Sequence, residues 1–382
     1  MERPRPRRRR PDAIAILVLV TLALALGAAE LFLRLFVGPA PVVGKLTYAT
    51  LDGADITPAD AIATGKIVPV QPPGPRPRDM FAPNNSFYLV YDNGRLPRDW
   101  FDAQGRVLVR INRYGLRERD DITPEKPAGQ RRIVCLGDSF TFGWGIPEEL
   151  GWVRKLEDRL RVDRGDVRTV NCGAAGTVCV DEYTAGLVNR FHVFQPDAVV
   201  LTICLNDLIP SSGLNLQGPA PNTGSRLLDL LLGAMGHSPL QLDPAHDWVG
   251  ELLKLDAATA TSADLVGGDK PFEAMWSQGV PQKSLREAKA FCEARKIPFL
   301  VTLWPFLQGL GPGRHYPFHK LHDLVAADCA AAGIPFLDVL PALRGTREEE
   351  LWVTPFDAHA NPRAQELALP AIERFVREHT RW

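Results

Sequence analysis

The chain of 382 residues has almost no net charge, because 44 Lys and Arg residues balance 45 Asp and Glu residues and leave −1 at pH 7. Proteins that bind nucleic acid through its phosphates usually carry a basic excess on one domain. The balance therefore argues against nucleic acid as a partner. The one local excess is at the start, where six of the first ten residues are arginine.

The cysteines also lack a functional pattern, since their spacing matches neither a disulfide framework nor a zinc site. The six cysteines are Cys135, Cys172, Cys179, Cys204, Cys292 and Cys329. We expect the cysteines to be small buried hydrophobic residues. A disulfide between Cys292 and Cys329 remains an alternative. The one dense group of histidines, His315, His319 and His322, has no second ligand group beside it. We therefore expect no metal and no other cofactor.

A long apolar run follows the N-terminal arginines. Residues Ala13–Ala29 hold no charge, and the apolar character continues to Val37. As a helix this run can cross a hydrocarbon core of ~30 Å, provided that Glu30 and Arg34 pair near the outer interface. The arginines then stay in the cytoplasm and the rest is extracytoplasmic, in the periplasm or at the cell surface. The alternative is a cleaved signal peptide, because residues 27–29 are small enough for a cleavage site.

Composition divides the chain into five stretches. They are a basic cytoplasmic tail (1–12), a transmembrane signal-anchor (13–37), a Pro-rich stalk (38–79), a small β-rich preface (80–130) and a main domain (131–382). The main domain alternates strand and helix patterns, which predicts a parallel sheet with crossover helices. An insertion at 210–282 interrupts this rhythm, and its apolar stretch Ser225–Met235 is either a packing helix or a lid.

The apolar patterns also predict individual elements. Strands are expected at Arg132–Leu136, Val167–Asn171, Ala198–Ile203, Pro298–Leu303 and Pro335–Val339. Helices are expected at Glu148–Val162, Thr177–His192, Gln282–Lys296, Lys320–Ala332 and Pro362–His379. A small antiparallel β element is expected at 86–117 in the preface.

The stretch RRIVCLGDSFTFGWG holds the candidate nucleophile. Its apolar run Ile133–Leu136 is typical of a buried strand, and Gly137 ends that run. Ligands of open parallel sheets bind beyond the carboxyl ends of the strands, where Ser139 is expected to lie. A capped strand-to-helix turn would give the same local pattern. A serine hydroxyl also needs a base and a group that orients the base.

Three further strand ends carry polar or small residues. The second expected strand opens through glycines into a helix that begins after Gly176, and the third ends beside Asn206. Near the C-terminus, Asp357 and His359 are two residues apart in an expected loop, which can place a carboxylate beside an imidazole. Each of these motifs alone is also compatible with ordinary turn and cap chemistry.

Taken in order, these signals resemble the SGNH (GDSL-type) hydrolase superfamily over about residues 131–382. The resemblance implies a flavodoxin-like three-layer α/β/α fold with a five-stranded parallel sheet. It implies Ser139 as nucleophile, His359 as base and Asp357 as the acid that orients the base. It also implies an oxyanion hole made by the backbone N–H groups of Ser139 and Gly176 and the side-chain amide of Asn206. The segment RINRYGLR (110–117) is similar to the preface of membrane-anchored bacterial members.

The chain departs from the family pattern at two places. Cys204 stands two residues before Asn206, where the family often has glycine. The terminal block has Asp-x-His at Asp357 and His359 in place of the commoner Asp-x-x-His, which leaves the geometry of that pair open.

The resemblance predicts an extracytoplasmic serine esterase that hydrolyses ester bonds, of the O-acyl kind, in an envelope glycan, a lipid or a small ester. Two alternatives remain open, an O-acyltransferase acting on envelope polysaccharide and a catalytically silent membrane-anchored binding module. The expected partners are the ester or acylated glycan substrate and the membrane, reached through the N-terminal helix. The sequence leaves the oligomeric state open.

Overall fold

The computed structural model describes most of the chain. The described residues are 11–36, 45–56, 66–67, 80–92, 98–118, 121–175, 179–208, 225, 227–228, 276, 279–314, 316, 318–354 and 357–380. They belong to two compact units, one formed by 1–43 with 217–243 and the other by 44–216 with 244–382. Most of the insertion at 210–282, including most of the apolar stretch Ser225–Met235, lies outside the described residues.

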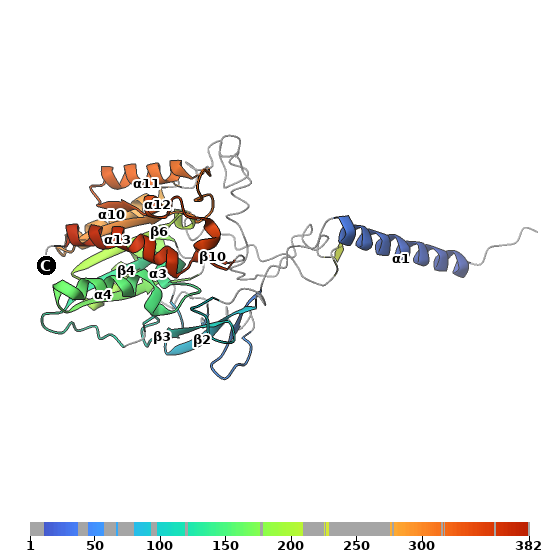
Figure 1. The fold of residues 1–382 in the computed structure, drawn as a ribbon, viewed down its shortest axis with the longest axis horizontal. Coiled ribbons are helices and arrows are strands. Elements are labelled where there is room, and N and C mark those ends of the chain that lie inside the picture. Colours follow the sequence, from blue (N-terminus) through green and yellow to red (C-terminus); the bar gives the residue numbers. More distant parts are fainter. Residues whose placement is uncertain are drawn as a thin grey trace, which may run out of the picture. The chain divides into compact units, whose positions relative to one another are not determined.

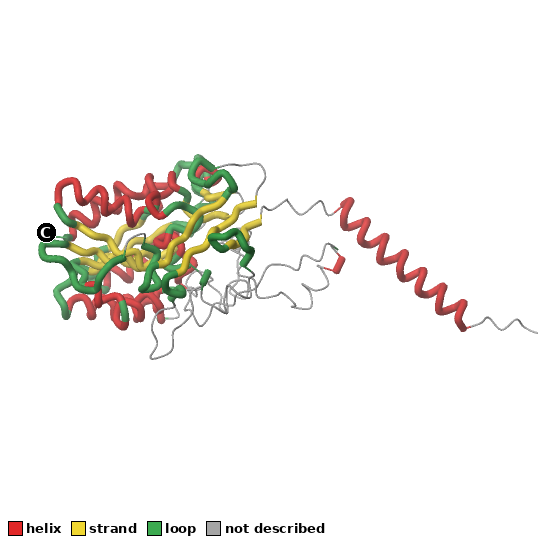
Figure 2. Tube along the Cα trace, turned by 90° about the horizontal axis from the view of Figure 1, so that it is seen from below, coloured by secondary structure: helices red, strands yellow, loops and turns green. Residues whose placement is uncertain are grey.

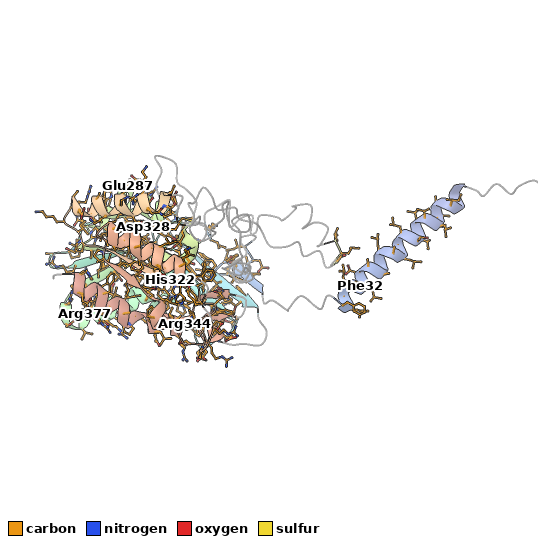
Figure 3. The ribbon with its side chains drawn as sticks, turned by 90° about the horizontal axis from the view of Figure 1, so that it is seen from above. Phe32, Glu287, His322, Asp328, Arg344 and Arg377 are labelled. Carbon is orange, nitrogen blue, oxygen red and sulfur yellow. The ribbon has the colours of Figure 1, made fainter. Side chains whose placement is uncertain are left out.

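The first unit contains one long apolar helix, α1 (Pro11–Phe36) (Figure 1). Its 26 residues are long enough to cross a hydrocarbon core of ~30 Å. The large apolar side chains of α1, Phe32 among them, are exposed (Figure 3). Glu30 and Arg34 form the expected pair at 2.6 Å, and the other carboxylate oxygen of Glu30 accepts from Ser225 Oγ at 3.0 Å.

The second unit is built on a five-stranded parallel sheet, as the sequence predicted. Its strands are β4 (Arg131–Gly137), β5 (Val167–Gly173), β6 (Ala198–Cys204), β7 (Phe299–Trp304) and β8 (Phe336–Asp338). They lie in the order β5-β4-β6-β7-β8, which is the flavodoxin-like arrangement. All residues of β6 and β7 are buried, which explains their continuous apolar sequences. The order reverses at β4, so the carboxyl end of β4 is the switch point of the sheet.

Helices cover both faces of this sheet and make the fold three-layered (Figure 2). The described α-helices of the second unit are α3 (Ser139–Phe142), α4 (Trp152–Arg164), α5 (Val180–Asn189), α10 (Val280–Glu293), α11 (His319–Ala331), α12 (Leu340–Leu343) and α13 (Pro362–His379). Helix α4 packs on α13, and α5 packs on α10. Arg377 of α13 ties the first pair together through Asp163 of α4 at 2.9 Å (Figure 3).

Four short 3₁₀ helices are also described, at Glu148–Leu150 (η1), Phe191–Phe194 (η2), Leu205–Leu208 (η3) and Glu348–Glu350 (η5). The helix expected to start at Glu148 therefore starts at Trp152. Gly151 has an extended backbone, φ −72° and ψ 147°, and separates η1 from α4. The sequence pattern missed this break because the apolar spacing continues across it.

Two strands of the preface and one strand from the predicted stalk form a three-stranded antiparallel sheet (Figure 1). Its strands are β1 (Lys45–Ala49), β2 (Asn85–Asp92) and β3 (Arg106–Ile111), in the order β1-β2-β3. The sequence predicted β2 and β3, but it placed 45–49 in the stalk. Phe87, Leu89 and Tyr91 alternate on the buried face of β2, as expected for a sheet with one face against a core.

Buried carboxylates close the free edge of β5. Glu157 accepts from the backbone N–H of Thr169 at 2.8 Å, and Glu118 accepts from that of Asn171 at 2.6 Å. Arg154 lies between the two carboxylates and bonds to Glu118 at 2.6 Å and to Glu157 at 2.7 Å. Side chains of the preface and of α4 therefore accept from two backbone N–H groups of this edge strand.

The cysteines and His322 are buried in this structure. All six cysteines are buried free thiols, so Cys292 and Cys329 are not bridged. Burial raises the pKa of the Cys292 and Cys329 thiols to about 12. His322 of α11 binds Asp338 at 2.9 Å and Tyr316 at 3.1 Å (Figure 3). Among the described residues no group of three or more metal-ligating side chains is present.

The buried ion cluster yields a stability prediction. Arg154→Met leaves Glu118 and Glu157 as buried carboxylates that have lost their central cation, so we expect a loss of about 3–5 kcal/mol in unfolding free energy. Arg159→Met on the same helix is the matched control. Arg159 is half exposed in its pair with Glu373, so the expected loss is under about 1 kcal/mol. Urea unfolding of the detergent-solubilised chain measures both, and equal losses would contradict this account of the cluster.

Candidate active site

The candidate nucleophile lies on a sharp turn at the end of β4. Gly137 has φ +153°, and a side chain there would press against the carbonyl oxygen of Thr202 at 2.9 Å. Asp138 follows and caps α3, because its Oδ1 accepts from the N–H of Phe140 at 2.9 Å. Ser139 is the first residue of α3 and is 8% exposed. The turn therefore sets the hydroxyl at the switch point, where the sequence expected it.

Strand β5 approaches this turn closely. A Cβ at Gly173 would lie 2.2 Å from the backbone nitrogen of Phe142, which no side chain could occupy. Glycine is required here for close packing of two backbones, since the φ of Gly173 is not in the left-handed region. Gly173, the last residue of β5, thus lets α3 pack closely against this strand.

Asp357 and His359 form the predicted carboxylate–imidazole pair. They lie on β10 (Asp357–Ala360), which pairs with β9 (Trp352–Thr354), whereas the sequence pattern had suggested a loop. Side chains two residues apart share one face of a strand, which lets Asp357 Oδ1 reach His359 Nδ1 at 2.5 Å. Asp357 is 1% exposed, whereas the side chain of His359 is 21% exposed. The short Asp-x-His spacing is therefore compatible with a bonded pair.

The imidazole of His359 packs against the nucleophile turn. The rings of Phe140 and Trp144 each lie 6.0 Å from it, centroid to centroid. Ser139 Oγ donates to Asp138 Oδ2 at 3.4 Å, and among the described contacts no hydrogen bond joins it to His359. Catalytic hydrogen bonds are often long or absent without substrate, and a rotation of the serine side chain can redirect its hydroxyl.

Local charges set the proton affinities of the site. Burial lowers the pKa of His359, but the Asp357 carboxylate and its hydrogen bond raise it more, and the net shift is upward. Asp138 adds to this upward shift. Burial raises the pKa of Asp138 to about 6, although the N–H of Phe140 and the charge of His359 oppose the change. An imidazole beside two carboxylates is well suited to accept a proton.

Part of the predicted oxyanion hole lies outside the described residues. This applies to Gly176 and to the side chain of Asn206, whose backbone belongs to η3. Cys204, the departure from the family pattern, is a buried residue whose N–H donates to Asp207 at 2.9 Å. The roles of the Ser139 and Gly176 N–H groups and of the Asn206 amide remain predictions.

The preface contacts both halves of the candidate site, through two residues that the sequence analysis did not single out as site residues. Arg117 donates to the carbonyls of Phe142, Gly143 and Ile146, just after the nucleophile. Tyr91 Oη donates to Asp357 Oδ2 at 2.7 Å. Arg117 ends the preface motif RINRYGLR, so a signal for it existed in the sequence. Tyr91 had only a weak signal, its place on the buried face of a strand, where a phenol needs a partner.

Comparison with known proteins adds the family. The model of the GDSL-like lipase/acylhydrolase family matches residues 135–367. The chain belongs to this family. No curated protein matches it.

Solved structures of GDSL-type proteins are similar to the chain only at low identity. A lipolytic G-D-S-L protein from Desulfitobacterium hafniense has 13% identity and a TM-score of 0.38, and the match covers 64% of this chain and 98% of that one. EstA, a psychrotrophic esterase from Pseudoalteromonas sp., has 13% identity and a TM-score of 0.38, with 65% and 97% covered. A lipase/acylhydrolase from Enterococcus faecalis has 14% identity and a TM-score of 0.38, with 66% and 97% covered.

Family membership makes the protein an SGNH serine hydrolase of the esterase or lipase type. The matched region runs from β4 into α13, so it contains the Ser139 turn and the Asp357–His359 pair. The preface lies before the matched region. Tyr91 and Arg117, which contact the candidate site, therefore lie outside the family match.

The charges around His359 predict the pH dependence of activity. A base must be neutral to accept a proton, and the pKa of His359 is raised. The acid limb of kcat/KM for p-nitrophenyl acetate should therefore lie above pH ~6.5, with activity lost as pH falls through it. Asp357→Ala removes the main raising charge, so the limb should move to lower pH while kcat falls by roughly 10²- to 10⁴-fold. A limb that stays in place in this variant would contradict the assignment of Asp357.

Proposed function

We propose that the protein is a membrane-anchored, extracytoplasmic serine esterase. Its substrates would be O-acyl esters of an envelope glycan or of a lipid, or small ester molecules. Ser139 is the nucleophile, His359 the base and Asp357 the acid that orients the base. The observation that carries the proposal is the Asp357–His359 pair, bonded at 2.5 Å and packed on the turn that presents Ser139.

Acylation begins when Ser139 Oγ attacks the ester carbonyl carbon and passes its proton to His359 Nε2. The bond from His359 Nδ1 to Asp357 fixes the tautomer with Nε2 free to accept and stabilises the imidazolium that forms. The tetrahedral intermediate then collapses, the ester C–O bond breaks, and His359 returns the proton to the leaving alcohol. An acyl-serine remains.

Deacylation repeats the steps with water. His359 takes a proton from the water as its oxygen attacks the acyl carbon, and the bond to Ser139 Oγ then breaks as the serine regains a proton. In both halves the oxyanion would be held by the N–H groups of Ser139 and Gly176 and by the Asn206 amide. Loss of one such donor typically costs about 3–4 kcal/mol in the transition state.

The location follows from the N-terminal segment. Six arginines precede α1, and basic residues beside an apolar helix favour the cytoplasmic side. The main domain follows α1 and would therefore lie outside the cytoplasm. Envelope esters are the substrates that an anchored hydrolase meets at that position, which supports O-acyl glycans and lipids as its substrate class.

The proposed chemistry predicts covalent labelling at Ser139. A fluorophosphonate should label the detergent-solubilised chain and p-nitrophenyl acetate should be hydrolysed, whereas Ser139→Ala should lose both activities and keep its melting temperature. Ser284→Ala, which removes a buried serine from α10, should keep both activities. Labelling is read by intact mass and hydrolysis by released acid.

The outcomes separate the alternatives. A folded wild-type chain that neither labels nor hydrolyses esters would be a silent binding module. Labelling that persists in Ser139→Ala would place the nucleophile elsewhere. If acylated sugar exceeds free acid when millimolar glycan acceptor is added, the protein is an O-acyltransferase.

The anchor predicts an intact N-terminus in the mature protein. We expect N-terminal sequencing of the membrane fraction to find the arginine-rich start. We also expect added protease to digest the main domain in intact cells whose outer membrane or cell wall has been removed. A mature chain that begins at Glu30 would show a cleaved signal peptide and contradict the anchor. Protection of the main domain in such cells would contradict its extracytoplasmic side.

A further inference from the structure

Asp357 has two hydrogen-bond partners on its two carboxylate oxygens. Oδ1 binds His359 Nδ1 at 2.5 Å, and Oδ2 accepts from Tyr91 Oη at 2.7 Å. Tyr91 is 3% exposed and lies on β2, 266 positions before Asp357 in the chain. The predicted acid is therefore held from one side by the base and from the other by the antiparallel sheet.

The second bond restrains a motion that the first leaves free. A carboxylate bound through one oxygen can still turn about the bond to its Cβ, because that torsion has a broad energy minimum. A donor on the other oxygen fixes the plane of the carboxylate and with it the direction of the bond to His359. The phenol also draws negative charge away from the imidazole side.

Packing holds the phenol itself in place. The ring of Tyr91 stacks on Phe101, with centroids 4.8 Å apart and planes 11° apart. Gly145 leaves room for the hydroxyl, because a Cβ there would lie 2.6 Å from Tyr91 Oη. Nearby, Arg98 donates to the carbonyl of Val353 on β9 at 2.9 Å, so the preface also binds the hairpin that carries Asp357.

We propose that Tyr91 is a positioning residue for the esterase reaction, one that orients Asp357 and through it His359, so that the antiparallel sheet completes the active site. The proposal rests on the proposed function, because it assigns Tyr91 a part in that chemistry. It gives the preface a role beyond linking the anchor to the hydrolase domain.

The charges around Tyr91 favour a protonated phenol that donates its hydrogen bond to Asp357. Burial and the Asp357 carboxylate raise the pKa of Tyr91 well above its usual value, so the hydroxyl keeps its proton across the working range. Tyr48 and Arg117 also face Tyr91, with opposite effects on its pKa. On the other side of the pair, Asp138 faces His359.

The test compares two tyrosines of the same strand. Tyr91→Phe removes the donor and keeps the ring, and we expect kcat for p-nitrophenyl acetate to fall about tenfold with KM changed by less than about twofold. The acid limb of kcat/KM should move to higher pH, because more negative charge then faces the imidazole. Tyr88→Phe is the matched control, since Tyr88 points to the other face of β2, under Arg106. It should change none of these values.

A double-mutant cycle shows whether Tyr91 acts through Asp357. Tyr91→Phe should lower the urea midpoint of the native chain, because it leaves Asp357 Oδ2 without its donor. The same change in an Asp357→Ala background should leave the midpoint unchanged. If Tyr91→Phe alone is too unstable to assay, the double variant is a folded protein in which the same substitution can be compared with Asp357→Ala.

Each other outcome overturns the proposal. Wild-type kcat and an unmoved pH profile in Tyr91→Phe would show that the phenol does not serve the reaction. Equal losses in Tyr88→Phe would show that only the integrity of the sheet matters, and equal midpoint shifts in both backgrounds would show no coupling to Asp357. If the wild-type chain lacks esterase activity and labelling, the proposed function fails, and the stability cycle still decides whether Tyr91 holds Asp357.

Discussion

A buried carboxylate needs a hydrogen-bond donor at each oxygen, and this need governs how the candidate active site is assembled. Asp357 is 1% exposed, and its donors come from His359, two residues away, and from Tyr91, 266 positions before it. An unpaired buried charge is costly enough that the fold must bring these groups together. The consequence is that a sheet formed early in the chain and a hairpin formed near its end share one site.

The same need explains the free edge of the parallel sheet. Glu118 and Glu157 accept from backbone N–H groups of β5, and Arg154 and Arg168 each pair with both carboxylates. Glu118 belongs to the preface and Glu157 to α4, so the edge strand is held from two directions. β5 in turn reaches the nucleophile turn at Gly173, whose missing side chain allows the contact. Stability and site geometry are therefore linked through one strand.

These contacts change how the preface is understood. By sequence it lies between the apolar helix α1 and the region 135–367 that matches the family model. In the structure it belongs to the same compact unit as the hydrolase sheet and donates hydrogen bonds to the nucleophile turn through Arg117. In this arrangement, the geometry of the candidate active site depends on correct folding of the preface. Truncation before β4 would remove donors that Asp357 and the turn depend on.

The local pattern of residues was enough to predict the five parallel strands, their helices and the place of Ser139, because apolar runs and the glycine at 137 act over a few residues. It also paired Asp357 with His359 from their spacing of two residues, although it expected a loop where the structure has β10. Three features were decided only by tertiary structure. The segment 45–49 became a strand because β2 offered it an edge, and Gly151 broke a helix whose apolar spacing ran on. Tyr91 met Asp357 because chain folding joined positions that no local period connects.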